Sequence, residues 1–300
     1  MAAPVPRQNA RAALLIALLG FFSLSIGDAV VKSMAGQWPA PAVAALRYSF
    51  GALGLAAIVG LRMGRSGFVL PRPALQLGRG AAVALATICF FAGVYAMPLA
   101  DATAIQFSSP IVTALLSPLV LGERTRPATW AATLLAFVGV LIVLRPNVAA
   151  LGAAAFLPLG AAFGMSWLMM FNRKAAGDAP VLVMQFLLAA FAAPLLILAA
   201  AAFGAFVQPI PPPTVAVVAK CLAVAFFATL GHGLIFAAVE RADASVVAPM
   251  TYVQLIVAAG IGWAWFGDRV DVTTFGGAAL IIGGGLLLWR AQRAVSGRRE

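Results

Sequence analysis

The sequence predicts an all-α integral membrane protein whose ten transmembrane helices form two inverted five-helix repeats, with both termini in the cytoplasm. Three observations carry this prediction. The chain is 63% hydrophobic and only 10% charged, whereas soluble domains carry about 25% charged residues. Its apolar residues gather in runs close to the length of about twenty residues that crosses a bilayer. One half of the chain also repeats features of the other, which is the usual trace of an internal duplication.

Ten apolar runs follow one another, separated by short connections that contain charged residues, Pro or Gly. None of these connections is long enough for a soluble domain. The runs are continuous rather than alternating, so we expect helices and not the strands of a β-barrel. The first five runs lie at 12–34, 41–61, 77–96, 102–121 and 127–144, and the second five at 151–171, 180–203, 214–239, 244–266 and 272–289.

Two runs of the first repeat have distinctive features. The opening run follows Arg7 and Arg11 and has no small-residue cleavage site after a short core, so we predict an uncleaved first span. The fourth run contains Pro110 and Pro118. A proline inside a membrane helix produces a kink that neighbouring helices absorb, or serves as a hinge for alternating access. The corresponding place in the second repeat holds Pro249, which favours the hinge.

The internal duplication is read from matching acidic and glycine residues. Asp101 and Asp243 each precede an apolar run that ends at a glycine followed by an acidic residue, at Gly122 and Gly267, and the two spacings differ by three residues. Five spans per repeat is an odd number, so the second copy must enter the membrane from the opposite side. Inverted repeats of this kind recur in secondary transporters. The predicted repeats are 1–148 and 149–300.

Lys and Arg residues are distributed unevenly among the connections. When alternate connections are assigned to the same side, 15 of the 20 basic residues fall on the side of the two termini. Cytoplasmic segments of membrane proteins carry such an excess, so we predict that both termini are cytoplasmic. We therefore expect a multi-pass protein of the cell inner (plasma) membrane.

Short motifs at matching places resemble the drug/metabolite transporter superfamily, in particular its EamA type. Ala45-Leu46-Arg47-Tyr48 enters the second run, and Gly122-Glu123-Arg124 closes the fourth. The second repeat departs from the pattern, since Gly267-Asp268 stands where Gly-Glu is common. The resemblance covers essentially the whole chain. It implies paired five-helix repeats and export of small metabolites, with amino-acid exporters, including those for aromatic amino acids, as the favoured branch.

The resemblance also implies a central cavity built from the third, fourth, eighth and ninth spans, with contributions from the first and sixth. The polar and aromatic side chains in those spans are neutral, so we expect an amphiphilic ligand of low net charge. A zwitterionic amino acid with a large apolar side chain fits, as does a neutral drug-like compound, whereas a phosphorylated sugar calls for convergent Lys or Arg. The candidate substrate-binding residues are Thr87, Phe90, Phe91, Tyr95, Gln106, Ser109, Trp167, His232, Tyr252, Gln254 and Trp263.

Charged groups inside membrane spans are costly and therefore need a reason. Asp28 and Lys32 lie four residues apart on one face of the first span, so we expect them to pair near the outer interface. Direct contact with substrate is the alternative. Arg47 is expected to hold backbone carbonyls or Asp28, and the alternative is that it binds a substrate carboxylate.

Three acidic residues, Glu123, Glu240 and Asp243, lie in the predicted cytoplasmic connections. Pairing with neighbouring arginines in solvent is the default interpretation, and a gate latch is the sharper alternative. Asp268 lies in the matching position on the outer side.

His232 is the only histidine of the chain and lies between Gly231 and Gly233 in the eighth run. It either couples transport to protons by titrating near neutral pH or serves as a hydrogen-bonded packing residue in a helix thinned by glycine. The sequence leaves both interpretations open.

Other function classes find little support in the sequence. Basic residues are scattered, so no nucleic-acid partner is expected. Cys89 and Cys221 are isolated and fit no metal or disulfide pattern, and no cofactor motif or catalytic constellation is present. We predict a non-enzymatic, monomeric secondary exporter of amino acids with apolar or aromatic side chains, whose partners are its small-molecule substrate and the lipid bilayer. A proton-coupled multidrug exporter is the alternative.

Overall fold

The fold is known from a computed structural model that describes residues 10–121, 127–241, 248–269 and 271–296. All the regular structure of these residues is helical. Six of the helical segments are long and apolar enough to cross a membrane, and three further apolar helices are shorter. The prediction of an all-α membrane fold is confirmed at this level.

The helices follow the predicted runs in order. In the first half they are α1 (Ala10–Lys32), α2 (Ala40–Met63), η2 (Gly64–Gly67), α3 (Pro73–Ala96), α4 (Leu99–Gln106), α5 (Ser109–Leu121) and α6 (Pro127–Leu151). In the second half they are η3 (Gly152–Phe156), α7 (Leu157–Lys174), α8 (Val181–Phe206), α9 (Val215–Arg241), η4 (Ala248–Tyr252), α11 (Val253–Phe266) and α12 (Val272–Ser296).

The fourth and ninth runs are each divided into two helical pieces. The fourth breaks between α4 and α5 at Phe107 and Ser108, shortly before Pro110. Proline has no backbone N–H, so it interrupts a continuous helix but fits the first turn of a new one, as Pro110 does in α5. The ninth run begins as the 3₁₀ turn η4, which contains Pro249, and continues as α11. Pro118, by contrast, lies inside α5 without interrupting it.

The boundary between the fifth and sixth runs differs from the prediction. α6 continues past the expected end at Leu144 to Leu151, and α7 begins at Leu157 rather than at Leu151. Gly152 adopts a φ of +58° after α6, a conformation that glycine reaches without a Cβ penalty and that commonly ends a helix. Pro158 lies in the first turn of α7, where a missing N–H costs nothing.

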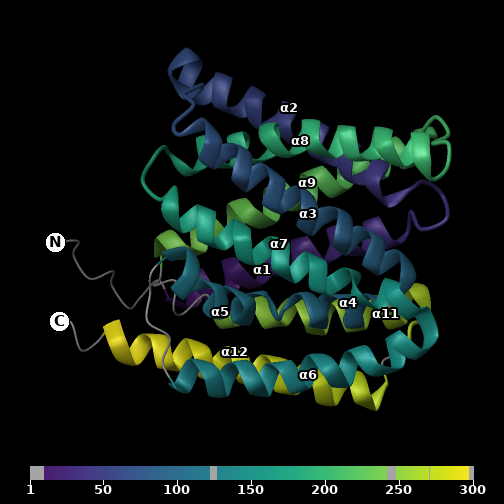
Figure 1. Cartoon of the computed structure of the whole chain (residues 1–300). Coiled ribbons are helices and arrows are strands. Elements are labelled where there is room, and N and C mark those ends of the chain that lie inside the picture. Colours follow the sequence, from purple (N-terminus) through teal and green to yellow (C-terminus); the bar gives the residue numbers. More distant parts are fainter. Residues whose placement is uncertain (1–9, 122–126, 242–247, 270, 297–300) are drawn as a thin grey trace.

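Helices from the two halves of the chain pack against each other in pairs (Figure 1). α1 packs along α9, α3 along α7, α2 along α8, and α6 along α12. α4 and α5 also contact α7, while η4 and α11 contact α1. This pattern survives an exchange of the two halves: α1–α9 becomes α7–α3, and the α2–α8 and α6–α12 pairs map onto themselves.

Small residues allow the paired helices to approach closely. A Cβ added to Gly231 of α9 would lie 2.9 Å from the carbonyl oxygen of Gly20 in α1, and one added to Gly164 of α7 would lie 2.7 Å from the backbone nitrogen of Ala86 in α3. Such contacts are typical of helix pairs in membranes, where van der Waals packing replaces the hydrophobic effect.

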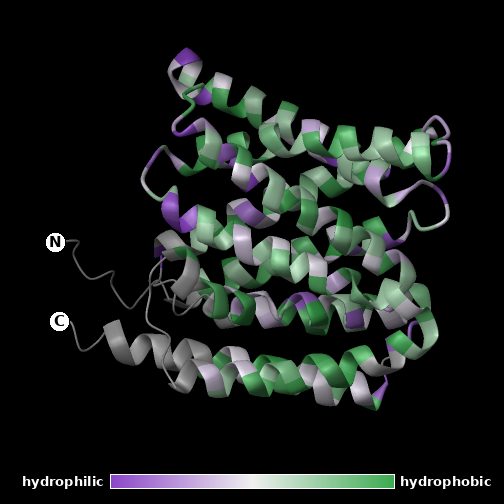
Figure 2. Cartoon of the chain, in the orientation of Figure 1, coloured by the Kyte–Doolittle hydropathy of each residue, from purple (hydrophilic) through white to green (hydrophobic). Residues whose placement is uncertain are grey.

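The outer surface of the bundle is apolar. Large hydrophobic side chains are widely exposed, among them Leu61 and Phe206 at 88% each. Figure 2 shows hydrophobic residues along the bodies of the helices and hydrophilic residues mainly toward the two ends of the bundle. A soluble protein rarely exposes apolar patches of this extent. The chain is therefore a multi-pass membrane protein.

Candidate functional site

Two half-buried groups of opposite charge lie in the bundle, Asp28 on α1 and Arg47 on α2. Gln254 of α11 donates a hydrogen bond from Nε2 to Oδ2 of Asp28 at 3.2 Å. One turn earlier, the Ser25 hydroxyl donates to the backbone oxygen of Gln254, also at 3.2 Å. These two bonds fasten α1 to α11 and fix the position of the Asp28 carboxylate.

Arg47 is held by aromatic rings. Its guanidinium lies 4.3 Å from the ring centroid of Tyr48 and 5.9 Å from that of Phe91, and Arg favours such stacking. Within the described part of the chain, it has neither a hydrogen-bond acceptor nor an ion pair with Asp28 within 4 Å. The Arg47 charge nevertheless lies within electrostatic reach of Asp28 and Cys221. His232, by contrast, is exposed on α9.

One face of α3 lines this region with residues spaced four apart. Thr87 donates a hydrogen bond to the Tyr48 hydroxyl at 3.1 Å, and Phe91 lies against Arg47. The hydroxyl of Tyr95 has no hydrogen-bond partner, and it is the one buried side-chain N or O atom of the described residues of which this is true. Buried polar atoms are almost always paired in native structures, so an unpaired one calls for an explanation.

α9 contributes His232 and Cys221. A ring nitrogen of His232, Nδ1, lies 2.7 Å from the Ala228 carbonyl oxygen one turn earlier. Cys221 is fully buried, and its sulfur lies 3.9 Å from that of Met34. α9 is continuous through both residues.

Several other predicted substrate-binding residues lie in aromatic or backbone contacts of their own. Tyr252 meets Phe107 edge to face at 6.0 Å between centroids, so it bridges the breaks in the fourth and ninth runs. Trp167 lies 5.5 Å from Phe171, in an aromatic row along α7. The backbone oxygen of Ser109 accepts a hydrogen bond from Ser166 of α7 at 2.8 Å.

Three further predicted residues make none of the polar contacts described above. Phe90 is buried in the main hydrophobic core, and Gln106 is half-buried at the end of α4. Trp263 is 71% exposed on α11. The structure does not bring Trp263 together with Asp28 and Arg47.

The expected ion pair between Asp28 and Lys32 is not formed, which corrects the prediction. Lys32 pairs instead with Asp268 and also donates to the Met97 carbonyl at 3.2 Å. Asp268 in turn accepts a hydrogen bond from the backbone N–H of Leu99, 3.1 Å away, at the start of α4. A carboxylate at a helix N-terminus gains from the helix dipole, so Asp268 offers Lys32 a better-fixed partner than Asp28 does. The predictions at Glu123 and Asp243, and at the side chain of Glu240, lie outside the described residues.

A second polar contact closes the same end of the bundle. Lys220, near the start of α9, donates to the Ser33 carbonyl at 3.2 Å and to the Gln37 side chain at 3.1 Å. Nearby, the Trp38 indole donates to the Pro211 carbonyl at 2.8 Å. Every one of these contacts joins the first half of the chain to the second.

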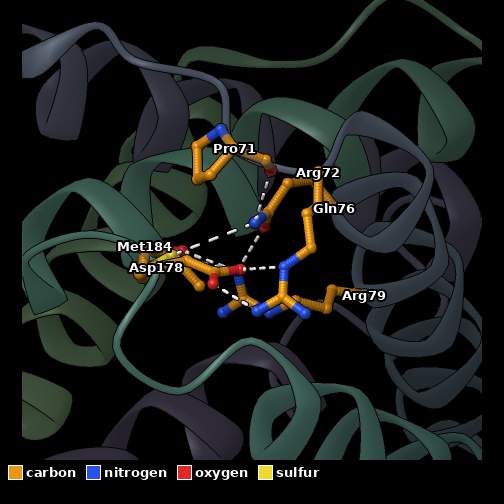
Figure 3. A network of polar contacts seen from close by, with 6 residues as sticks. All are labelled: Pro71, Arg72, Gln76, Arg79, Asp178 and Met184. Atoms are coloured by element: carbon orange, nitrogen blue, oxygen red, sulfur yellow. Dashed lines mark hydrogen bonds and ion pairs between the residues drawn. The ribbon is translucent and has the colours of Figure 1, made fainter.

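The opposite end of the bundle has its own network, drawn in Figure 3. The buried Arg79 donates to Gln76 at 2.6 Å and to the Met184 carbonyl of α8 at 3.3 Å, and it also reaches Asn172 of α7 at 2.7 Å. Arg72 forms an ion pair with Asp178. The hydrogen bond that Arg72 donates to Asp178 raises the pKa of the Arg72 guanidinium. Both arginines belong to the basic residues that the sequence places on the side of the termini, and Arg79 is the one charge within the run 77–96.

A buried carboxylate at Asp101 was also missed as a structural residue. Its two oxygens accept hydrogen bonds from Asn147 of α6 and Thr274 of α12, each at 2.8 Å. Asp101 therefore fixes α4 to the α6–α12 pair. The sequence placed it at a connection because the helix α4 is too short to be recognised on its own.

Comparison with known proteins identifies the family. The sequence profile of the EamA-like transporter family matches residues 11–145 and, a second time, residues 152–290. The chain belongs to the EamA-like transporter family. The resemblance inferred from its short motifs is thus confirmed.

Several known proteins match over almost the whole chain. A protein of Pseudomonas aeruginosa named pseudopaline exporter CntI is 28% identical over 94% of this chain and 98% of its own. A riboflavin transporter of Rhizobium johnstonii is 29% identical over 96% and 93%, and an S-adenosylmethionine uptake transporter of Rickettsia bellii is 26% identical over 93% and 94%. A crystal structure of a protein that is 21% identical matches 95% of this chain and 99% of that one with a TM-score of 0.60, which shows the shared fold.

Proposed function

We propose that this EamA-family transporter has ten transmembrane spans arranged as two inverted repeats, 1–148 and 149–300. Two observations support the proposal. The family profile matches the chain twice, with one match in each proposed repeat. The helix contacts also keep their pattern when the two halves are exchanged, as a two-fold axis in the membrane plane requires.

We further propose that both termini are cytoplasmic. α1 begins and α12 ends at the same end of the bundle (Figure 1). The excess of basic residues in the connections at that end supports the assignment. Single cysteines at Ser66 and Gln208, both exposed, test it in a variant without Cys89 and Cys221. A membrane-impermeant maleimide added to intact cells should label position 208 and not position 66, and the reverse pattern contradicts the orientation.

The substrate class that the interior supports best is an amino acid with an apolar or aromatic side chain. The observation that carries this proposal is the opposed pair Asp28 and Arg47, set among aromatic residues such as Phe91. One acidic and one basic group suit a zwitterion, and the rings suit an apolar side chain. The S-adenosylmethionine named for one relative contains an amino-acid group, which is consistent with this class.

We infer that transport proceeds by alternating access in a monomer. Polar contacts between the two halves close one end of the bundle through Lys32 and Lys220, and the other end through Arg72 and Arg79. Breaking one set while keeping the other exposes the interior to one side at a time. The breaks before Pro110 and at Pro249 supply helices that can bend during this motion.

Counterflow of labelled phenylalanine in proteoliposomes tests the function. Unlabelled tryptophan and phenylalanine should compete, and a lipophilic cationic dye should not. Absence of counterflow for every amino acid, together with dye movement down a proton gradient, would reject amino-acid export and support the multidrug alternative, in which Asp28 would bind the cation. Orientation-sorted vesicles then distinguish export from uptake.

A further inference from the structure

We propose that the interior holds a two-ended recognition site for α-amino acids, in which Arg47 and Tyr95 bind the substrate carboxylate while Asp28 and Gln254 bind its ammonium group. This inference rests on the proposed function and names the side chains that bind the charged groups of the substrate.

The carboxylate end is defined by donors without acceptors. A guanidinium carries five N–H donors, yet no acceptor among the described residues reaches that of Arg47, which is held only by the rings of Tyr48 and Phe91. Arg47 is half-buried, and a charge partly withdrawn from water is costly unless it is paired. A ligand carboxylate supplies a planar acceptor that matches the guanidinium fork. The rings keep the fork in place before the ligand arrives.

Tyr95 adds a second donor to this end. It lies one helical turn beyond Phe91 on the same face of α3, where side chains four residues apart are about 6 Å or less from each other. Cys221 of α9 lies within electrostatic reach of both Tyr95 and Arg47. The hydroxyl of Tyr95 is the unpaired buried atom of the described structure, so a ligand oxygen gives it the partner that the protein does not.

The ammonium end is defined by a carboxylate with spare acceptor capacity. Within the part of the chain that the structure describes, Asp28 receives one hydrogen bond, from Gln254 to Oδ2, whereas an ionised carboxylate accepts about four. The side-chain oxygen of Gln254 has no hydrogen-bond donor among the described residues. These two acceptors match the three donors of a primary ammonium.

The two ends together select for a zwitterion. A ligand without a carboxylate leaves Arg47 unpaired, and a ligand without an amine leaves Asp28 with its single bond. A site built to pair with a polar group rejects analogues that lack it, because its own buried groups then lose their partner. We expect an analogue that lacks either the carboxylate or the amine to bind at least about tenfold more weakly than the intact amino acid.

The ligand arm of the test uses competition against labelled phenylalanine with purified protein. Phenylalanine methyl ester lacks the carboxylate and 3-phenylpropionate lacks the amine. Both should compete at least about tenfold more weakly than phenylalanine itself. Equal competition by either analogue overturns the corresponding end of the site while leaving amino-acid transport intact. Absence of any phenylalanine binding overturns the proposed function and this inference with it.

The protein arm uses conservative variants. Tyr95→Phe removes one hydroxyl. It should weaken the binding of phenylalanine severalfold and leave the affinity for the methyl ester unchanged. Asp28→Asn should weaken the binding of phenylalanine and should leave the affinity for 3-phenylpropionate unchanged or higher. Arg241→Gln is the matched control, because Arg241 is exposed and its one hydrogen bond among the described residues goes to the Ala237 carbonyl of its own helix.

Folding defects are separated from binding defects by the melting temperature. The Tyr95 hydroxyl has no hydrogen-bond partner among the described residues, so its removal should leave the stability of the ligand-free protein unchanged or raise it. A Tyr95→Phe protein that melts normally and binds phenylalanine and its ester as the parent does would overturn the role of Tyr95.

Discussion

A single carboxylate, Asp101, joins three helices that are far apart in the chain. It is 6% exposed and accepts hydrogen bonds from Asn147 and Thr274. Asp101→Ala leaves both donors buried without an acceptor, and each unpaired group costs about 1–3 kcal/mol. We therefore expect a clear fall in the melting temperature of the detergent-purified protein, with amino-acid binding lost only in proportion to unfolding.

A second substitution checks the origin of that loss. Adding Thr274→Val to Asp101→Ala removes one of the two orphaned donors, so the double variant should melt at a higher temperature than Asp101→Ala alone. If the two substitutions simply add their losses, the hydrogen bond between these residues does not contribute as described.

At the scale of elements, close packing of α1 and α9 depends on one of two glycines that look equivalent in the sequence. A Cβ on Gly231 would meet the Leu24 side chain at 2.8 Å and the Gly20 carbonyl at 2.9 Å, whereas a Cβ on Gly233 would meet nothing within 4 Å. Gly231→Ala should therefore lower the melting temperature, and Gly233→Ala should preserve or raise it because alanine favours the helix. Equal effects of the two substitutions would contradict this packing.

Length and hydropathy were enough to predict the helices, but not the partners of their polar side chains. Lys32 has one acidic residue four positions away on its own helix, Asp28, and another 236 positions away, Asp268. It pairs with the distant one, because tertiary packing of α1 against α4 and α11 brings Asp268 to it. Arg47 was predicted to hold backbone carbonyls or Asp28, and among the described residues it contacts the rings of Tyr48 and Phe91 instead. The breaks at Pro110 and Pro249 were predictable because proline acts locally.

The contacts at the Lys32 end of the bundle should control access to a native cysteine. Cys221 is fully buried and adjoins Lys220, which bonds to Ser33 and Gln37. Asp268→Asn removes the ion pair with Lys32 and so weakens this closure. In a Cys89→Ala background, a water-soluble maleimide should therefore label Cys221 severalfold faster in Asp268→Asn than in the parent. An unchanged rate would show that the ion pair does not keep this end closed.

At the scale of the whole molecule, alternating access requires that the two closures oppose each other. Arg79 is the centre of the closure at the other end, where it joins α3 to α7 and α8. Arg79→Gln shortens the side chain and removes its charge, so it should favour opening at that end. If the interior opens to one side at a time, the population open near Cys221 must fall. Maleimide should then label Cys221 more slowly in Arg79→Gln than in the parent.

The combined variant separates alternation from general loosening. Arg79→Gln with Asp268→Asn weakens both closures, so the labelling rate of Cys221 should return toward that of the parent, because the two shifts in population oppose each other. A bundle that merely became looser would label Cys221 faster with each substitution and fastest with both.

Saturating phenylalanine provides a further check on the same labelling rate. A ligand that bridges Arg47 and Asp28 joins α1, α2 and α11, so it should change the Cys221 labelling rate in the parent. The methyl ester at the same concentration should change it far less.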